Sequence, residues 1–131
     1  GRLYDIETVA LRLFNVYGPG QIVSPSHPPV IPQFLRQTLG GGSVVINGNG
    51  EQTRDFVFVE DVVEALITAS LVKHVDRQII NVGSGQECSI NQLVHLVEQT
   101  TGKKASVLYN EQESGGISRL VADLGRAKRL L

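Results

Sequence analysis

Residues 8–20 read TVALRLFNVYGPG, and this stretch decides which fold class the rest of the sequence is compatible with. β-branched and aromatic residues are frequent from Thr8 to Tyr17, and Gly18-Pro19-Gly20 ends the run, which predicts a strand followed by a turn. The strand is apolar on both faces, as is typical of a central strand covered on both sides.

Strands and helices alternate along the rest of the sequence. Tight-turn residues at 47–50 predict a hairpin turn, Ser89 and Gln92 predict a capping box, and Asp123 is expected to cap the last helix. We expect helices over 30–39, 60–72, 90–100 and from 123 onward, and strands over 43–46, 54–59, 78–82 and 105–109. This alternation predicts an α/β fold with a mixed or parallel sheet.

The composition narrows the class of protein. The 131 residues carry 12 Lys and Arg against 13 Asp and Glu, which argues against a protein that mainly binds nucleic acid. No apolar run reaches the roughly 18 residues of a membrane span. The single Cys excludes an intramolecular disulfide, so we expect a reducing, cytoplasmic location. The first residue is not Met and the last helical pattern has no terminator, so we expect a piece of a longer protein.

Asn15 is a polar residue near the end of an apolar strand. A buried amide needs a hydrogen-bond partner, and the carboxyl ends of strands are where open α/β sheets bind ligands. Asn15 is therefore either a ligand contact or an amide satisfied by the backbone at the turn.

Arg54 opens the strand that follows the 47–50 turn. A guanidinium can bind a phosphate in two-point geometry, which suits a diphosphate ligand. The alternative is that Arg54 pairs with neighbouring acids or lies in solvent.

Other polar features favour structural roles. Asp61 suits the first turn of a helix, and residues 83–85, Gly-Ser-Gly, lack the pattern of a dinucleotide or P-loop motif. The three histidines share no metal spacing, and Cys88 has no basic neighbour that would lower its pKa. No Tyr-x-x-x-Lys pair is present. The residues thus suggest ligand binding without an acid–base pair.

Five segments together carry a family resemblance: LRLFNVYGPGQ (11–21), VIPQFL (30–35), INGNGEQTRDFVFVEDVVEA (46–65), INVGSGQECSINQL (80–93) and SRLVADLGRAKRLL (118–131). The chain resembles the C-terminal portion of the NAD-dependent nucleotide-sugar epimerases and dehydratases, extended short-chain dehydrogenases that include UDP-glucose 4-epimerase. The resemblance implies that residues 1–131 form a single incomplete unit. It would hold the last Rossmann-sheet strands and the nucleotide-sugar-binding domain, with the NAD-binding region absent.

The resemblance also implies roles for individual residues. Asn15 would contact the sugar diphosphate and Arg54 would bind phosphate. Val30 and Ile31, at the start of a helix, would lie along the nucleotide. The backbone of the strand residues Val45, Ile46 and Asn47 would read the base. Glu113 stands where many members have a second Arg, and Arg119 is the candidate replacement.

We therefore predict the nucleotide-sugar-binding part of an NAD-dependent epimerase similar to UDP-glucose 4-epimerase. We expect it to be inactive alone, to have no catalytic or metal-binding residues and not to bind NAD tightly, although the parent enzyme would use NAD. The partner would be a UDP- or dTDP-linked sugar, not nucleic acid or a membrane, and residues 8–17 would allow self-association. The alternatives are a dehydratase or decarboxylase of the same family, or a non-catalytic binding or scaffolding module.

Overall fold

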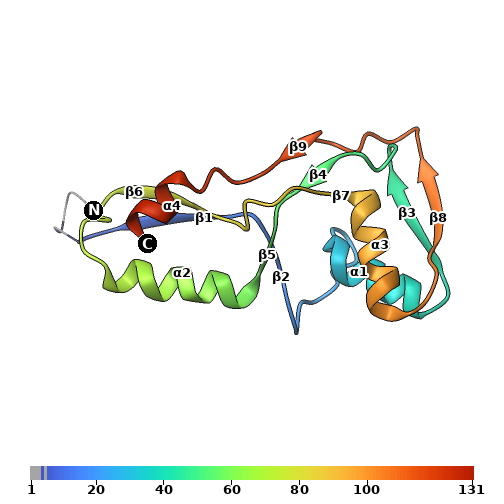
Figure 1. The fold of residues 1–131 in the computed structure, drawn as a ribbon, viewed down its shortest axis with the longest axis horizontal. Coiled ribbons are helices and arrows are strands. Elements are labelled where there is room, and N and C mark those ends of the chain that lie inside the picture. The colour runs from blue at the N-terminus through green and yellow to red at the C-terminus, as the bar shows by residue number, and fades with distance from the viewer. Residues whose placement is uncertain (1–3, 5) are drawn as a thin grey trace. The chain divides into compact units, whose positions relative to one another are not determined.

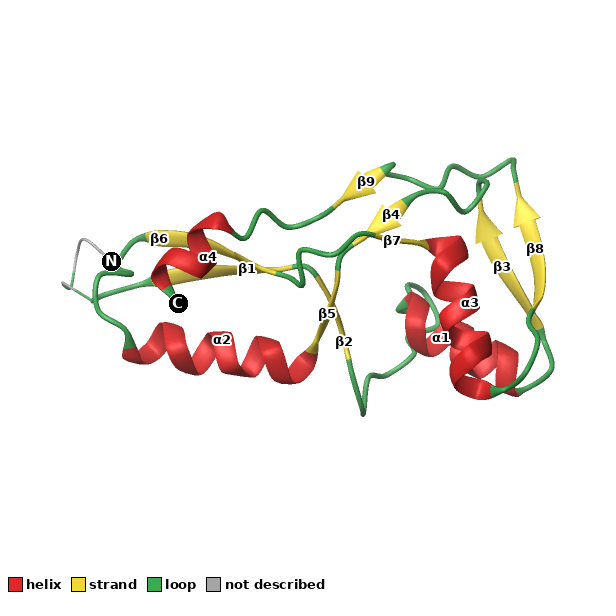
Figure 2. Cartoon of the chain, in the orientation of Figure 1, coloured by secondary structure: helices red, strands yellow, loops and turns green. Residues whose placement is uncertain are grey.

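A computed structural model describes residue 4 and residues 6–131 (Figure 1). Helices and strands alternate as the sequence predicts (Figure 2). The chain divides into two compact units, of which the first contains three separate segments and the second contains two. Unit 1 comprises residues 1–18, 55–86 and 121–131, and unit 2 comprises residues 19–54 and 87–120. The expectation of one incomplete unit stays a prediction.

Unit 1 is built on parallel strand pairs. Strand β1 (Val9–Leu13) pairs with β6 (Gln78–Val82), and β2 (Asn15–Tyr17) pairs with β5 (Phe56–Phe58). Helix α2 (Val59–Leu71) packs against β1, β2 and β5, and helix α4 (Gly125–Leu130) packs against β6. Apolar side chains between the strands and α2 form the core: Leu11, Val16, Val57, Val62, Ala65 and Val82.

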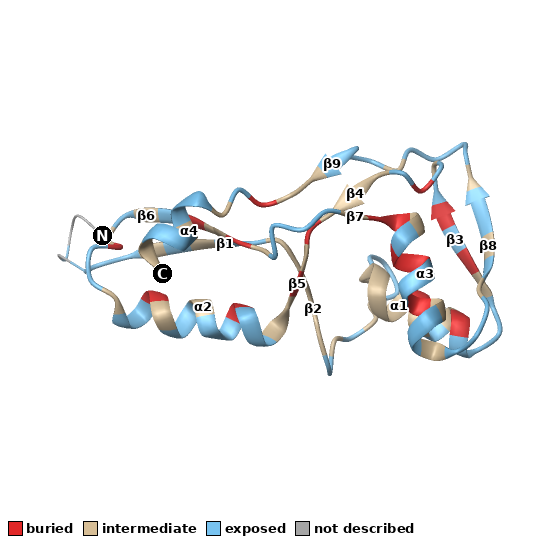
Figure 3. Cartoon of the chain, viewed as in Figure 1, coloured by how far each residue is buried: buried red, intermediate tan, exposed pale blue. Residues whose placement is uncertain are grey.

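Residues 8–17 differ from the expected single covered strand. The run breaks at Phe14, where pairing passes from β6 to β5: the N–H of Phe14 donates to Val82 O, and that of Asn15 donates to Asp55 O. Among the described residues, β1 has a strand partner on one edge only. Ala10, Arg12 and Leu13 are exposed, so among the described residues β1 lacks the cover on both sides that is typical of a central strand. Figure 3 colours the chain by burial.

Unit 2 holds helices α1 (Val30–Leu39) and α3 (Ile90–Thr101), which pack against each other. Strand β3 (Ser43–Asn47) pairs in parallel with β8 (Ser106–Asn110). A second sheet has β4 (Thr53–Arg54) between antiparallel β7 (Cys88–Ser89) and parallel β9 (Arg119–Leu120). Buried apolar side chains come from α1, β3 and α3: Phe34, Val44, Ile46, Leu93, Val94 and Val97.

Several local predictions are confirmed. Helix α1 and strand β6 have the predicted bounds. Both hydrogen bonds of the capping box form, because Ser89 Oγ accepts from the Gln92 N–H and Gln92 Oε1 accepts from the Ser89 N–H. Gly102 ends α3 at φ 66°, in the left-handed region that glycine adopts without steric cost.

Other local predictions are wrong. The turn at 47–50 forms, but β3 and β4 do not pair as a hairpin, because β3 pairs with β8 and β4 with β7 and β9. The 54–59 strand is interrupted at Asp55, where its backbone passes from unit 2 to unit 1. Helix α4 is capped one residue later than expected, at Leu124, although Asp123 Oδ1 accepts the Gly125 N–H at 2.8 Å.

Candidate ligand-binding site

Arg54 in strand β4 is held by main-chain carbonyl groups. Its Nη1 donates to Thr53 O and to Ile117 O, each at 2.7 Å, and its Nη2 donates to Gly115 O at 3.2 Å. No carboxylate of the described residues forms an ion pair with it. The half-buried guanidinium is therefore held in a fixed orientation without a carboxylate partner among the described residues, as suits an anion-binding group. Neither pairing with acids nor a free position in solvent describes it.

The loop between β8 and β9 approaches Arg54 through two glycines. A Cβ on Gly115 would meet the Gln52 side chain at 2.7 Å, and Gly116 has φ +76° with Arg54 Nη2 3.8 Å from its Cβ position. Glycine at 115 leaves room for the Gln52 side chain, and glycine at 116 adopts a positive φ without steric cost. Glu113, in the same loop, is exposed.

Arg119 lies in strand β9 and is paired with Glu87. Its Nε lies 3.1 and 3.0 Å from the two Glu87 carboxylate oxygens, and its Nη2 lies 3.0 Å from Oε2. Thr53 Oγ1 also donates to Glu87, at 2.7 Å. The Thr53 hydroxyl, followed by Arg119, holds the pKa of Glu87 below its usual value.

The position of Arg119 in the sheet sets it apart from Arg54. It is the register partner of Thr53, the residue before Arg54. Because successive side chains of a strand point to opposite faces, Arg119 and Arg54 lie on opposite faces of this small sheet. A role for Arg119 at a diphosphate stays a prediction, and would require it to leave Glu87.

Asn15 lies in unit 1, at the start of β2. Its Nδ2 donates to Asp55 O at 3.1 Å, and its backbone N–H donates to the same oxygen at 3.2 Å. The backbone acceptor belongs to Asp55, the residue just before β5, and not to the 18–20 turn. Among the described residues no hydrogen bond engages Asn15 Oδ1, so the amide is fixed at one end and open at the other.

The segments expected to contact a nucleotide belong to α1 and β3 in unit 2. Val30 and Ile31 form the first turn of α1 and are half-buried. In β3, Ile46 is 2% exposed and faces the core, whereas Val45 and Asn47 are exposed. Within residues 4 and 6–131, β3 is paired along one edge only. One main-chain acceptor of β3 is already engaged, because Asn47 O accepts from Gln52 Nε2 at 2.9 Å.

Asp55 is a residue that the sequence reasoning missed. It is 0% exposed, and its carboxylate accepts from the Gly-Ser-Gly loop at residues 83–85. The N–H groups of Ser84 and Gly85 are therefore engaged by an internal anion and are not available to a phosphate. The available signal was a lone carboxylate inside RDFVFV, because a charge within an apolar strand must find several donors.

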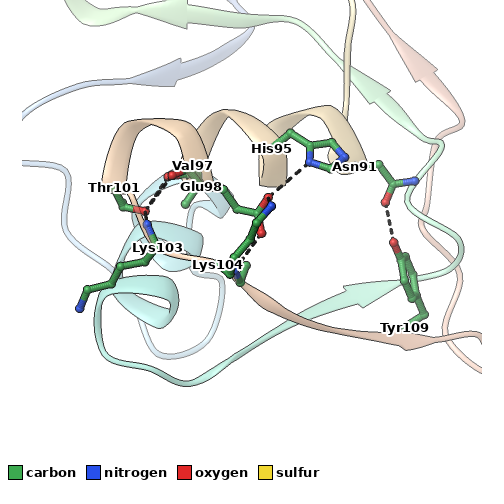
Figure 4. Close-up of polar contacts among 9 residues, drawn as sticks. Asn91, His95, Val97, Glu98, Thr101, Lys103, Lys104 and Tyr109 are labelled. Atoms are coloured by element: carbon green, nitrogen blue, oxygen red, sulfur yellow. Dashed lines mark hydrogen bonds and ion pairs between the residues drawn. The ribbon is translucent and has the colours of Figure 1, made fainter.

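His95 and Cys88 fit structural roles. His95 Nδ1 lies 3.4 Å from Glu98 Oε2, and Lys104 Nζ lies 3.3 Å from the same oxygen (Figure 4). Burial raises the pKa of the Cys88 thiol. In the part of the chain that the structure describes, no three His, Cys, Asp or Glu side chains are grouped to hold a metal ion. Over the same residues, no helix has the length and hydrophobicity needed to cross a membrane.

Comparison with known proteins gives consistent matches over the chain. Residues 1–83 match the model of the NAD-dependent epimerase/dehydratase family. A putative UDP-glucose 4-epimerase of Methanocaldococcus jannaschii is 36% identical over 129 residues, covering 98% of this chain and 41% of the relative.

Solved structures agree with the sequence matches. A UDP-glucose 4-epimerase of Thermotoga maritima, solved with UDP-glucose, has a TM-score of 0.89 at 34% identity over 98% of this chain and 40% of its own. A UDP-glucuronic acid 4-epimerase of Bacillus cereus, solved with UDP-glucuronic acid and NAD, has a TM-score of 0.86 at 30% identity over 99% and 40%. The fold is therefore the C-terminal part of a Rossmann-type extended short-chain dehydrogenase, and the chain spans less than half the length of these relatives.

Proposed function

The chain belongs to the NAD-dependent epimerase/dehydratase family, and from that membership we propose that it is the nucleotide-sugar-binding part of a UDP-sugar epimerase. The observation that carries the proposal is the Arg54 guanidinium, oriented by three carbonyls and not neutralised by an acid. A diphosphate supplies the paired oxygens that such a group binds.

The remaining contacts are part of the same proposal. Asn15 would donate or accept at the sugar diphosphate. The main chain of β3 at Val45, Ile46 and Asn47 would read the base, and Val30 and Ile31 would lie along the nucleotide. Arg119 would join the diphosphate only after its ion pair with Glu87 opens.

NAD is the cofactor implied by the family, and the described residues do not fit it. The Gly-Ser-Gly loop after β6, at residues 83–85, has the N–H groups of Ser84 and Gly85 on the Asp55 carboxylate. An NAD pyrophosphate would need those donors. We therefore place no step of hydride chemistry on these residues and propose that NAD binds elsewhere in the complete enzyme.

We further propose that unit 1 supplies strands of the Rossmann-type domain and that unit 2 supplies most of the nucleotide-sugar contacts. We also propose a cytoplasmic location, which the single free Cys88 supports. Self-association through residues 8–17 is part of the proposal, and the open edge of β1 among the described residues supports it.

The test is UDP-glucose binding to the protein, measured by calorimetry for Arg54→Ala. We expect the loss of a charged hydrogen bond to weaken binding by about 1.5–3 kcal/mol. Arg36→Ala is the control, because Arg36 is an exposed arginine of the same unit. Unchanged affinity together with a lower melting temperature would assign Arg54 a purely structural role.

A further inference from the structure

Asp55 forms a cluster of hydrogen bonds inside unit 1. Its Oδ1 accepts from the Ser84 N–H and the Ser84 hydroxyl, both at 2.7 Å. Its Oδ2 accepts from the Gly85 N–H at 2.9 Å and the Ala122 N–H at 3.0 Å. Four donors satisfy the charge of a fully buried carboxylate, so the position of this side chain is strongly determined.

These bonds join three segments that are distant in sequence. Asp55 precedes β5, residues 83–85 follow β6, and Ala122 precedes α4. The packing is close: a Cβ on Gly83 would meet both Asp55 Oδ2 and Ala122 Cβ at 2.7 Å. The carboxylate therefore fixes the Asp55 peptide relative to two other parts of unit 1.

The same peptide holds the side chain of Asn15. Asp55 O accepts both the backbone N–H and the Nδ2 of Asn15. A carbonyl that binds Nδ2 sets the rotation of the amide, and no described residue forms a hydrogen bond with Oδ1.

We propose that Asp55 is a positioning residue: its carboxylate anchors the peptide whose carbonyl orients the Asn15 amide toward a bound ligand. The ligand is the phosphate-linked sugar of the proposed function, and the inference rests on that function for the role of Asn15. Asp55 itself makes no ligand contact in this assignment, because its oxygens are all engaged within the protein.

The first test measures the orientation of Asn15 without any ligand. Proton exchange of its Nδ2 group is followed by NMR with ¹⁵N-labelled asparagine, and Asn15→Ala identifies the signal. Ser84→Ala removes one donor to Asp55 at an exposed position, and we expect about fivefold faster exchange. In Asp55→Asn, an NH₂ group would face N–H donors in place of a carboxylate oxygen that accepts from them. We therefore expect a larger increase in the exchange rate of the Asn15 Nδ2 protons.

The control is Asp61→Asn, an exposed carboxylate in the first turn of α2, which should leave the exchange unchanged. Should Asp55→Asn fail to fold, Ser84→Ala decides, because it leaves the carboxylate in place and removes only the hydrogen bonds that the Ser84 hydroxyl makes with Asp55 and with the Gln86 N–H. Wild-type exchange in folded Ser84→Ala, or in folded Asp55→Asn, overturns the proposal.

The second test is a double-mutant cycle on UDP-glucose affinity. Ser84→Ala should weaken binding about fivefold when Asn15 is present and have no effect in an Asn15→Ala background. Equal losses in both backgrounds would show a general structural effect and overturn the positioning role. If the wild-type protein does not bind UDP-glucose, the proposed function fails, and the exchange measurement alone decides whether Asp55 orients Asn15.

Discussion

At the scale of single residues, the buried carboxylate of Asp55 makes stability depend on pH. Burial by itself would raise its pKa, but hydrogen bonds from Ser84, Ala122 and Gly85 outweigh burial and hold the pKa below the ordinary value of 3.8. A group with a lowered pKa stabilises the fold above its unfolded-state pKa, and this stabilisation is lost as pH falls through the folded-state value.

We therefore predict that the free energy of unfolding falls as the pH is lowered below about 4. The measurement is urea denaturation at several pH values. Asp55→Asn should be less stable at neutral pH and should lose part of the acid dependence. An identical acid dependence in the variant would mean that other carboxylates carry it.

Gly83 is the second residue with a sharp expectation. Because an added Cβ would lie 2.7 Å from both Asp55 Oδ2 and Ala122 Cβ, Gly83→Ala should destabilise the protein by about 1–3 kcal/mol through overpacking. Gly42→Ala is the control, since its Cβ would meet only Gln37 O, at 3.7 Å. Equal denaturation midpoints for the two variants would contradict the close packing around Asp55.

At the scale of secondary-structure elements, the capping box should stabilise helix α3. Ser89→Ala removes the acceptor for the Gln92 N–H, 3.1 Å away, and loss of such a cap costs about 0.5–2 kcal/mol. Ser70→Ala, within α2, keeps every helix cap and should change stability little, because alanine favours helix. Chemical denaturation of both variants gives the comparison, and a Ser89→Ala protein as stable as wild type would show that packing alone holds the start of α3.

At the scale of the whole molecule, the open edge of β1 should promote self-association. Strand edges with unpaired backbone groups recruit other chains, and Leu13, 46% exposed, lies on this strand. Sedimentation should show oligomers that Leu13→Lys reduces. Ile22→Lys is the control, because Ile22 is exposed but lies in unit 2 and outside any strand. A monomer with residues 8–17 protected from hydrogen exchange would contradict the prediction.

The 131-residue protein by itself should also show no epimerase activity. The sequence has no Tyr-x-x-x-Lys pair, and its Gly-rich loop at residues 83–85 is occupied by Asp55. Incubation of the 131-residue protein with NAD and UDP-galactose should give no UDP-glucose above background. Turnover would show that these residues hold catalytic groups that we have not identified.

The sequence by itself determined the local structure and the family. Periodicity and turn residues placed α1, β6 and the ends of α3, because capping bonds and glycine conformations depend on residues a few positions apart. The ordered blocks around LRLFNVYGPGQ and TRDFVFVEDV were sufficient to identify the family. Asn15 and Arg54 were candidates because polar groups next to apolar strands need partners.

Only the tertiary structure decided which partners those groups have. Arg54 binds the carbonyls of Gly115 and Ile117, Arg119 is paired with Glu87, and the Asp55 carboxylate occupies the 83–85 loop. It also decided that β3 pairs with β8 and not with β4. Each of these contacts joins residues about 30 or more positions apart, and such contacts depend on how the whole chain folds back on itself. Local sequence patterns do not identify these distant partners, because a polar group is satisfied equally well by a near or a distant hydrogen-bond partner.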